Sequence, residues 1–363
     1  MNKESKIYIA GHNGLVGSSI VKILREKGYS NFVFRSSSEL DLVDQQATFD
    51  FFENEKPEYV FLAAAKVGGI HANNTFRAEF IYKNLMIQNN VIHSSYVSGV
   101  KKLLFLGSTC IYPKMANQPM KENELLTNIL EYTNEPYAIA KIAGIKMCES
   151  YNLQYGTNFI SVMPTNLYGF NDNFDLEKSH VLPALIRKMH ICRCLENDDY
   201  EAIRKDFSGY PNTIGSEATK NEIETYLTKF GIRKNDGKVV LHVWGSGKPY
   251  REFLWAEDMA DACVFLMENV DFEKMVEASD IDDSEIRNTH LNIGSGEEIS
   301  IKELAYLVKK IIGFTGEIKF DPSKPDGTPR KLTDPSKLHA LGWKHKIKLP
   351  DGIRMVYEHY KNR

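Results

Sequence analysis

The sequence predicts an α/β fold built on a doubly wound parallel sheet, with helices on both faces. Short, continuously apolar segments alternate with longer amphipathic segments over the first two-thirds of the chain. Strands that are apolar throughout are typical of a parallel sheet that is buried on both sides. A glycine-rich turn follows the first apolar segment and opens a helix, as in the first unit of a Rossmann-type sheet. We therefore predict this fold, followed by a smaller C-terminal α/β lobe.

Five strands of the sheet are expected in the first 165 residues. Their ranges are 6–10, 32–34, 59–65, 102–106 and 159–163. The helices expected between them run from the glycine turn to about residue 27 and over 45–54, 75–97 and 136–155. We assign residues 1–165 to a dinucleotide-binding domain, which also receives returning segments from the C-terminal half of the chain.

Residues 166–363 are expected to form mainly the smaller lobe, which binds a substrate near the carboxyl edge of the sheet. Its predicted helices and strands alternate less regularly, at 180–194, 239–244, 256–268, 290–293 and 301–312. The stretch 196–238 is polar and charged, with few large apolar side chains. These are Ile223, Tyr226, Leu227 and Phe230, whose spacing places them on one face of a helix. We interpret this stretch as an inserted surface element.

Composition narrows the classes of function. The 363 residues include 45 Lys and Arg against 48 Asp and Glu, whereas nucleic-acid-binding proteins usually carry a basic excess. No apolar run approaches the ~18 residues that cross a membrane, so we expect neither nucleic acid nor a membrane as a partner. The spacing of the five cysteines matches neither a disulfide framework nor a zinc site, and His190 near two of them does not complete one. We therefore expect no bound metal, and reduced thiols in the cytoplasm. The cysteines are Cys110, Cys148, Cys192, Cys194 and Cys263.

A dinucleotide site is predicted at the turn after the first strand. Between Gly11 and Gly17, glycines allow the backbone to turn tightly and to approach a pyrophosphate, and the following helix offers free N–H groups. At the end of the second strand, an NAD-binding protein usually places an acidic residue against the ribose. This chain has Arg35 and three serines there, which suit the 2′-phosphate of NADPH. The alternative for Arg35 is a solvated surface arginine.

A second group of residues indicates a carbonyl reductase or an alcohol dehydrogenase. Tyr137 and Lys141 lie one helical turn apart on the same helix face. Ser108 ends the fourth strand at the ligand edge of the sheet. A neighbouring ammonium group favours the phenolate, so Lys141 is expected to lower the pKa of Tyr137. A Tyr-x3-Lys pair is common by chance, but its place after the glycine turn and the serine makes it specific.

Longer motifs give the chain a resemblance to a known family. The spacing G-x-x-G-x-x-G resembles that of the short-chain dehydrogenase/reductase superfamily. The chain also resembles the GDP-L-fucose synthases, extended members of that superfamily that epimerise and reduce GDP-4-keto-6-deoxy-D-mannose. The segments that carry this resemblance are 63–70, 106–113, 134–141, 164–169 and 323–331. It covers nearly the whole chain, interrupted chiefly by 196–238.

The resemblance implies NADPH-dependent reduction of the C4 ketone of a GDP-4-keto-6-deoxy-sugar, with epimerisation at C3 and C5. The ketone acidifies the protons on C3 and C5, because the carbanion delocalises into an enolate. In the family a cysteine and a histidine exchange these protons, and they fall here on Cys110 and His180. The family's reductase roles fall on Ser108, Tyr137 and Lys141. Without the resemblance, Cys110 would be interpreted as a small buried residue and His180 as a helix N-terminal residue.

The motifs and the resemblance together give two sets of expected ligand-binding residues. Those for the cofactor are Gly11, Asn13, Gly14, Leu15, Val16, Gly17, Arg35, Ser36, Asp41, Leu42, Ala64, Tyr137, Lys141, Pro164, Asn166, Leu167 and His180. Those for the substrate are Ser108, Thr109, Cys110, Asn166, Lys188, Trp244, Arg251, Asp326 and Lys331. For each charged residue of the second set taken singly, the alternative is solvated surface charge.

The chain departs from the family pattern in three places. Asn13 and Ser37 stand where the family uses arginines against the 2′-phosphate, which weakens the NADPH preference. The stretch 196–238 exceeds the family's loop by roughly forty residues. It lies between Lys188 and Trp244 in the sequence, so the sugar is either a mannose-type hexose or a longer relative such as a heptose.

Other interpretations stay open. One is a C4 reductase that works after a separate epimerase, and another is a catalytically silent NADP-binding regulator. A sugar 4,6-dehydratase is disfavoured, because Thr109 and Cys110 occupy the place of the acidic residue that water elimination requires. The family pattern also implies a homodimer, formed through a four-helix bundle of the helices at 75–97 and 136–155.

Overall fold

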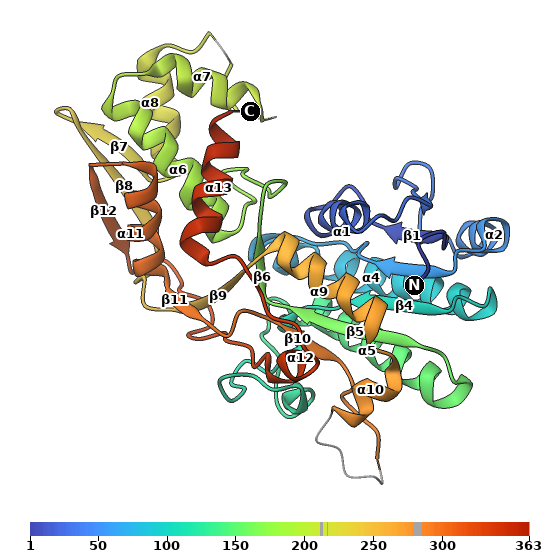
Figure 1. Cartoon of the computed structure of the whole chain (residues 1–363). Helices are drawn as coiled ribbons and strands as arrows, with labels where there is room; N and C mark the ends of the chain where they lie inside the picture. The colour runs from blue at the N-terminus through green and yellow to red at the C-terminus, as the bar shows by residue number, and fades with distance from the viewer. Residues whose placement is uncertain (211–212, 216, 279–284, 363) are drawn as a thin grey trace. The chain divides into compact units, whose positions relative to one another are not determined.

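The computed structural model describes residues 1–210, 213–215, 217–278 and 285–362. The chain divides into two compact units, which are coloured along the sequence in Figure 1. Unit 1 consists of Met1–Asn171, Glu252–Glu297 and Lys331–Ile347. Unit 2 consists of Asp172–Arg251, Glu298–Arg330 and Lys348–Arg363.

A six-stranded parallel sheet forms the centre of unit 1 and confirms the predicted fold class. Its order is β10-β5-β4-β3-β1-β2, with parallel pairing throughout. The strands are β1 (Ile7–Ala10), β2 (Phe32–Val33), β3 (Tyr59–Leu62), β4 (Lys102–Leu106), β5 (Phe159–Pro164) and β10 (Leu291–Ile293). Ala10 pairs with Leu62, and Leu62 with Phe105, so the carboxyl ends of these strands lie at one edge.

Alternate residues along each strand supply two separate cores. Ile7 and Ile9 of β1 belong to one hydrophobic core, and Tyr8 and Ala10 belong to the other, as the two-residue period of a strand requires. Helices from different parts of the chain cover the two faces (Figure 1). On the first face they are α1 (Leu15–Glu26) and α9 (Ala256–Asn269); on the second, α2 (Gln45–Glu55), α4 (Arg77–Val97) and α5 (Glu135–Tyr155).

Two segments predicted for the smaller lobe, 256–268 and 290–293, belong to unit 1. β10 pairs with β5 and extends the main sheet, and α9 packs against α1. Both are strongly apolar and complete the buried first face of the sheet. The shorter elements of unit 1 are α3 (Ile70–Thr75), η1 (Thr109–Ile111), η2 (Glu122–Glu124), β6 (Asn166–Tyr168), α10 (Phe272–Glu277) and α12 (Ser336–Ala340). β6 pairs in parallel with β9 (Tyr250–Trp255).

Unit 2 is built around a second, three-stranded sheet of order β12-β8-β7. β12 runs parallel to β8, and β7 runs antiparallel to it. The strands are β7 (Ile232–Asn235), β8 (Lys238–Trp244) and β12 (Glu317–Asp321), and β11 (Glu298–Ser300) is a further short strand. α6 packs on β8 and on α11, which also contacts α13. These helices are α6 (Val181–Glu196), α11 (Ile301–Ile312) and α13 (Leu349–Lys361).

Where the structure describes it, the predicted surface element at 196–238 belongs to unit 2. It forms α7 (Tyr200–Ser208), α8 (Lys220–Thr228) and β7. Ile203 and Phe207 on α7 and Ile223 and Leu227 on α8 are all at most 1% exposed. Each pair is spaced four residues apart, so one narrow face of each helix is buried. For α8 the spacing of these apolar residues in the sequence already predicts such a face, and the structure confirms it, whereas α7 was not predicted.

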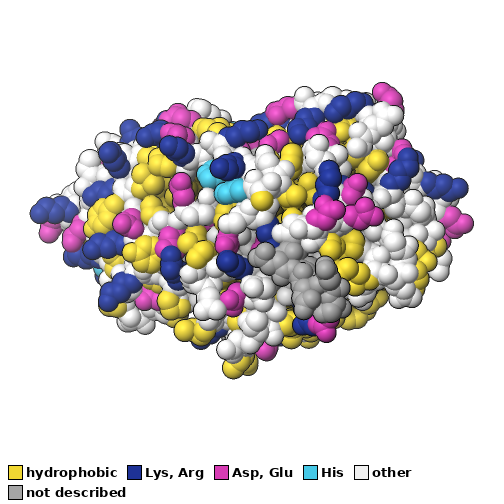
Figure 2. All heavy atoms as spheres, turned by 60° about the horizontal axis from the view of Figure 1, so that its bottom comes forward, with side chains coloured by type: hydrophobic (Ala, Val, Ile, Leu, Met, Phe, Trp, Pro, Cys, Tyr) yellow, Lys and Arg dark blue, Asp and Glu magenta, His cyan; other side chains and the backbone are white. Residues whose placement is uncertain are grey.

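The surface carries charges of both signs. On the face drawn in Figure 2, lysines and arginines are interspersed with aspartates and glutamates, and apolar side chains lie between them. This distribution agrees with the near balance of 45 basic and 48 acidic residues. Within the described part of the chain, no helix combines the length and the apolar character needed to cross a membrane.

Candidate active site

The carboxyl edge of the main sheet brings most of the expected cofactor residues together. The glycine turn follows β1, Arg35 follows β2, Ala64 follows β3, Ser108 follows β4 and Pro164 ends β5. Ligands of open α/β sheets bind at this edge. Further residues expected to bind the cofactor lie in these loops or at the adjoining ends of helices and strands. They are Asn13, Leu15, Val16, Ser36, Asp41, Leu42, Asn166 and Leu167.

Steric limits explain the glycines of the turn. Gly11 has a φ of +85°, and a Cβ there would lie 2.8 Å from the backbone nitrogen of Ala64. A Cβ on Gly17 would lie 2.1 Å from the carbonyl oxygen of Gly11. Gly14 precedes α1, and no side chain caps the first N–H groups of this helix. The turn therefore has the close backbone approach and the free donors that a pyrophosphate requires.

At the end of β2, Arg35 already has protein partners. Its guanidinium donates to the Phe34 carbonyl at 2.7 Å and forms an ion pair with Glu55 at 2.6 Å. Beside it, the Glu39 carboxylate accepts both the N–H and the hydroxyl of Ser36, each at 2.7 Å. Both side chains expected at the 2′-phosphate are therefore paired with acidic residues of the chain.

Lys141 is anchored beneath the edge of the sheet. It is 3% exposed, and its Nζ donates to the Leu106 carbonyl at 2.7 Å and lies 5.8 Å from the centroid of the Tyr137 ring. Burial lowers the pKa of Lys141 to about 8. A Cβ on Gly144 would lie 2.4 Å from the Phe105 ring, so this glycine lets α5 pack closely on β4. That packing holds the helix that carries Tyr137 and Lys141 against the strand that ends just before Ser108.

Tyr137 differs from the expectation in its ionisation. Burial raises the pKa of Tyr137, and the charge of Cys110 acts in the same direction. The expected lowering by Lys141 is wrong for this structure, because burial disfavours the charged phenolate. A tyrosine that stays neutral keeps the proton that a reductase must donate to the product oxygen.

Cys110 lies within the same group of side chains. It is carried by η1, is half-buried, and its N–H donates to the Ser108 hydroxyl at 3.4 Å. Burial raises the pKa of the Cys110 thiol, whereas the charges of Lys331 and Lys141 and the Ser108 hydroxyl oppose this shift. The other four cysteines are buried. Cys110 is therefore the accessible thiol among the cysteines, all of which are described.

Unit 2 carries most of the residues expected to bind the GDP moiety. Arg251 of β9 donates to the Tyr250 carbonyl at 2.7 Å, and burial lowers its pKa. Asp326 accepts the Ser246 N–H at 2.6 Å and its hydroxyl at 2.7 Å. Trp244, at the end of β8, is 64% exposed. Asp326 thus fixes the loop that follows Trp244.

α6 supplies the other two residues that the family pattern places in unit 2. His180 is the N-cap residue of this helix, with an exposed side chain. Lys188 lies two turns further along and is half-buried, and burial lowers its pKa. Its neighbour Arg187 is 1% exposed and pairs with Asp206 of α7 at 2.8 Å. The stretch 196–238 is thereby tied to the helix that carries Lys188.

Sequence reasoning missed Glu252, which organises the surroundings of this site in unit 1. Its side chain is fully buried. One carboxylate oxygen accepts the Thr333 N–H at 3.0 Å and the Thr333 hydroxyl at 2.7 Å; the other accepts the Gly296 N–H at 2.7 Å. Its carbonyl accepts the Asn166 amide at 2.8 Å. A single acidic residue before the apolar run 253–256 was the available signal.

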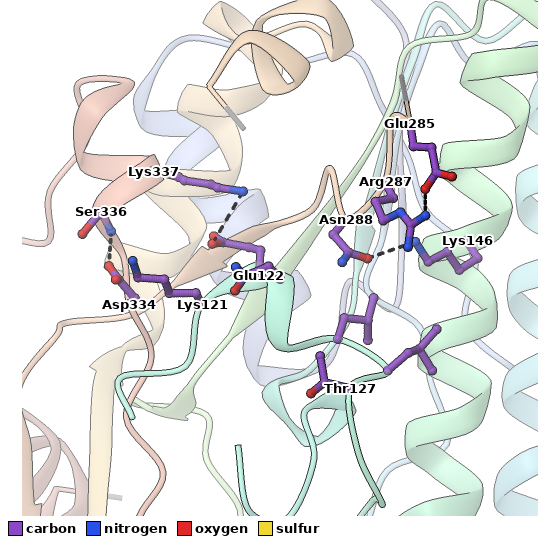
Figure 3. Close-up of a pocket in the computed structure, with 13 residues that line it drawn as sticks. Lys121, Glu122, Thr127, Lys146, Glu285, Arg287, Asn288, Asp334, Ser336 and Lys337 are labelled. Carbon is purple, nitrogen blue, oxygen red and sulfur yellow. Dashed lines mark hydrogen bonds and ion pairs between the residues drawn. The ribbon is translucent and has the colours of Figure 1, made fainter. Parts of the chain in front are cut away.

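A separate cavity of about 970 Å³ in unit 1 lies between η2, α5 and α12 (Figure 3). Its charged side chains mostly have protein partners. Glu122 pairs with Lys337, Arg287 pairs with Glu285, and Lys146 donates to Asn288. We therefore base the functional assignment on the carboxyl edge of the sheet and not on this cavity.

Comparison with known proteins identifies close relatives. The model of the NAD dependent epimerase/dehydratase family matches residues 7–205 and 207–294. GDP-L-fucose synthase 1 of Arabidopsis thaliana is 51% identical over 359 residues, which cover 99% of this chain and 94% of the relative.

Two solved structures from Campylobacter jejuni are similar over nearly the full length. A GDP-6-OMe-4-keto-L-xylo-heptose reductase has a TM-score of 0.91 and 49% identity, covering 100% of this chain and 99% of that chain. A GDP-mannoheptose C4 reductase with NADP bound has a TM-score of 0.87 and 48% identity, covering 99% of each chain.

Proposed function

This chain belongs to the GDP-L-fucose synthases of the NAD dependent epimerase/dehydratase family, and from this premise we propose that it reduces the C4 ketone of a GDP-4-keto-6-deoxy-sugar with NADPH. The observation that carries the proposal is the convergence of Ser108, Tyr137 and Lys141 beside the glycine turn at one edge of the sheet. A catalytically silent regulator would not need this complete set.

The residues present fit the dinucleotide. Gly11 and Gly17 leave the space that any Cβ would fill, and the uncapped start of α1 offers N–H donors to a pyrophosphate. NADPH, when bound, supplies the hydride. Lys141 orients the nicotinamide ribose and holds positive charge near Tyr137.

The reduction step follows from the protonation states. The Ser108 hydroxyl polarises the C4 carbonyl, and neutral Tyr137 donates its proton to the oxygen as the C4 carbon accepts the hydride. The Lys141 ammonium stabilises the resulting tyrosinate, because it lies 5.8 Å from the ring centroid in a buried setting. The proton that Tyr137 loses is regained from solvent before the next turnover.

Epimerisation at C3 and C5 is assigned to Cys110 as base and His180 as acid. A thiolate removes the proton, the electron pair passes into the C4 enolate, and the histidine returns a proton to the opposite face. The alternative is a C4 reductase that acts after a separate epimerase. The similarity to a Campylobacter jejuni protein named as a GDP-mannoheptose C4 reductase is the reason to test this alternative.

Binding of the GDP moiety is assigned to unit 2. Lys188 and Arg251 provide the cations for the two phosphates, and the exposed ring of Trp244 provides a stacking surface for the base. Asp326 holds the adjoining loop through Ser246. The residue that follows, Gly327, would place a Cβ 3.5 Å from the Arg251 guanidinium.

One assay tests these assignments. The protein is incubated in deuterated water with GDP-4-keto-6-deoxymannose or the corresponding heptose, together with NADPH, NADH or neither. We expect deuterium at C3 and C5 without cofactor, and oxidation of NADPH when it is present. Oxidation without deuterium uptake would establish the reductase alone, and no change with any sugar or cofactor would refute the proposed function.

We also propose a homodimer formed through α4 and α5. Tyr82, Val97, Leu153 and Tyr155 on these helices are 59%, 60%, 51% and 46% exposed, and burial of such apolar area would stabilise a helical bundle. The mass in solution, measured by light scattering, tests this proposal. The free state of all five cysteines supports residence in the reducing cytoplasm.

A further inference from the structure

We propose that Lys331 is the cation that stabilises the thiolate of Cys110 and that a buried frame of Glu252 and Asn292 positions it there. The inference rests on the proposed epimerisation and gives Lys331 a role in proton transfer rather than in nucleotide binding alone. Its basis is that the segment that carries Cys110 and the segment that carries Lys331 are both hydrogen-bonded to the buried side chain of Asn292.

The segment that carries Cys110 is held in place through Tyr112, two residues after the cysteine. The Tyr112 side chain is buried, and its hydroxyl donates to Asn292 Oδ1 at 2.6 Å. The Nε2 atom of His290 lies 3.1 Å from the same hydroxyl. Burial lowers the pKa of His290 to about 3, so its ring is neutral. Because the Tyr112 proton is given to Asn292, we assign Nε2 of His290 as the donor to the Tyr112 oxygen. Tyr112 therefore has a defined donor and a defined acceptor.

The segment that carries Lys331, residues 331–334, is hydrogen-bonded to the same asparagine. Asn292 Nδ2 donates to the Met120 carbonyl at 2.9 Å and to the Asp334 carbonyl at 3.3 Å. Met120 also exchanges backbone hydrogen bonds with this segment, donating to Leu332 at 2.8 Å and accepting from Asp334 at 2.9 Å. The two segments thus share a fully buried anchor.

Glu252 holds the segment that carries Lys331 at a further point, Thr333. Both the N–H and the hydroxyl of Thr333 donate to its carboxylate, at 3.0 and 2.7 Å. Thr333 is 1% exposed and lies two residues after Lys331. The backbone at 331–334 is therefore held by Asn292 and by Glu252, which limits where the Lys331 ammonium can lie.

Four groups act on the thiol from the elements around it. Lys331 comes from the segment before α12, Lys141 and Tyr137 come from α5, and Ser108 comes from the same loop. Of these, Lys331 makes the largest contribution against the rise in thiol pKa that burial causes. Lys141 also acts on the thiol, by a smaller amount, while its Nζ donates to the Leu106 carbonyl, so Lys331 is the main cation for the cysteine.

The proton transfer that this arrangement serves is balanced. The C–H bond at C3 or C5 breaks, its electron pair moves into the enolate whose charge rests on the C4 oxygen, and the proton forms the S–H bond of Cys110. The ammonium of Lys331 favours the thiolate before this step. Neutralising that charge by substitution reduces the fraction of thiolate at neutral pH and slows proton removal.

The test measures the thiol without any sugar. Cys110 is alkylated with iodoacetamide over a range of pH in the parent protein and in the Lys331→Met and Lys331→Arg variants. The other cysteines are at most 8% exposed, and a Cys110→Ser variant gives the background. We expect the methionine substitution to raise the midpoint by about one pH unit, which slows alkylation about tenfold at neutral pH. The arginine substitution should keep the parent profile within about twofold.

A second readout separates this role from nucleotide binding. If Lys331 only binds phosphate, Lys331→Met raises the KM for the GDP-sugar and leaves the alkylation profile unchanged, which overturns the proposal. Thermal unfolding of both variants shows whether the fold is kept. Because alkylation requires no turnover, a shifted profile with no activity on any sugar would refute the proposed function while supporting the role of Lys331.

Discussion

Glu252 offers a quantitative test of how unit 1 is held together around its site. Replacing it by glutamine keeps the size of the side chain and substitutes an amide nitrogen for one of two oxygens that both accept backbone N–H groups. Whichever way the amide turns, its NH₂ group faces the N–H of either Gly296 or Thr333. Thr333 is 1% exposed whereas Gly296 is exposed, so the amide is expected to face Gly296, where one hydrogen bond to a charged group is lost.

This loss sets the magnitude. A hydrogen bond to a charged group contributes about 1.5–3 kcal/mol. We therefore expect Glu252→Gln to lower the free energy of unfolding by about 1.5–3 kcal/mol. Urea unfolding followed by circular dichroism and by fluorescence measures this value.

The matched control is Glu358→Gln on α13, whose carboxylate pairs with Lys361 and is 64% exposed. An exposed pair of this kind contributes at most about 1 kcal/mol, so the control should unfold close to the parent protein. If Glu252→Gln also changes the free energy of unfolding by less than about 0.5 kcal/mol, the structural role of Glu252 is wrong.

Three further predictions follow from the site and from unit 2. Gly17→Ala places a Cβ 2.1 Å from the Gly11 oxygen and should weaken NADPH binding at least about 100-fold; an unchanged Kd by fluorescence titration contradicts this. Asp206→Asn leaves buried Arg187 without its ionic partner and should cost about 3 kcal/mol of stability, measured by chemical unfolding; a change within error refutes it. Since burial lowers the pKa of Lys141 to about 8, the ammonium is lost as pH rises through that value, so the single-turnover rate of reduction should fall there; a level rate well above it contradicts this role.

The doubly wound sheet was predictable because its signal is local. Each strand of the first half is a short apolar run, and each is followed by an amphipathic helix, so the sequence pattern repeats along the chain. The placement of Ser108, Tyr137 and Lys141 at this edge was also predictable. The helix period places the last two on one face, and parallel strands bring their carboxyl ends to one edge.

Other features depend on contacts between distant segments and left little trace in the sequence. β10 joins the sheet beside β5, although more than 120 residues separate them. Glu252 and Thr333 come together only in the fold, so neither stands out alone. The pKa of Tyr137 was misjudged for a related reason, because the spacing to Lys141 is visible in the sequence whereas the degree of burial is not.

Transfer of hydride to C4 in a Tyr137→Phe variant tests the central claim most directly. With deuterium at the reactive position of NADPH, a single turnover of the GDP-4-keto-sugar reports this step by itself. The account predicts a rate at least about 100-fold below that of the parent protein, with NADPH binding and deuterium exchange at C3 and C5 retained. A variant that reduces the ketone as fast as the parent would contradict the assignment of Tyr137 as the proton donor.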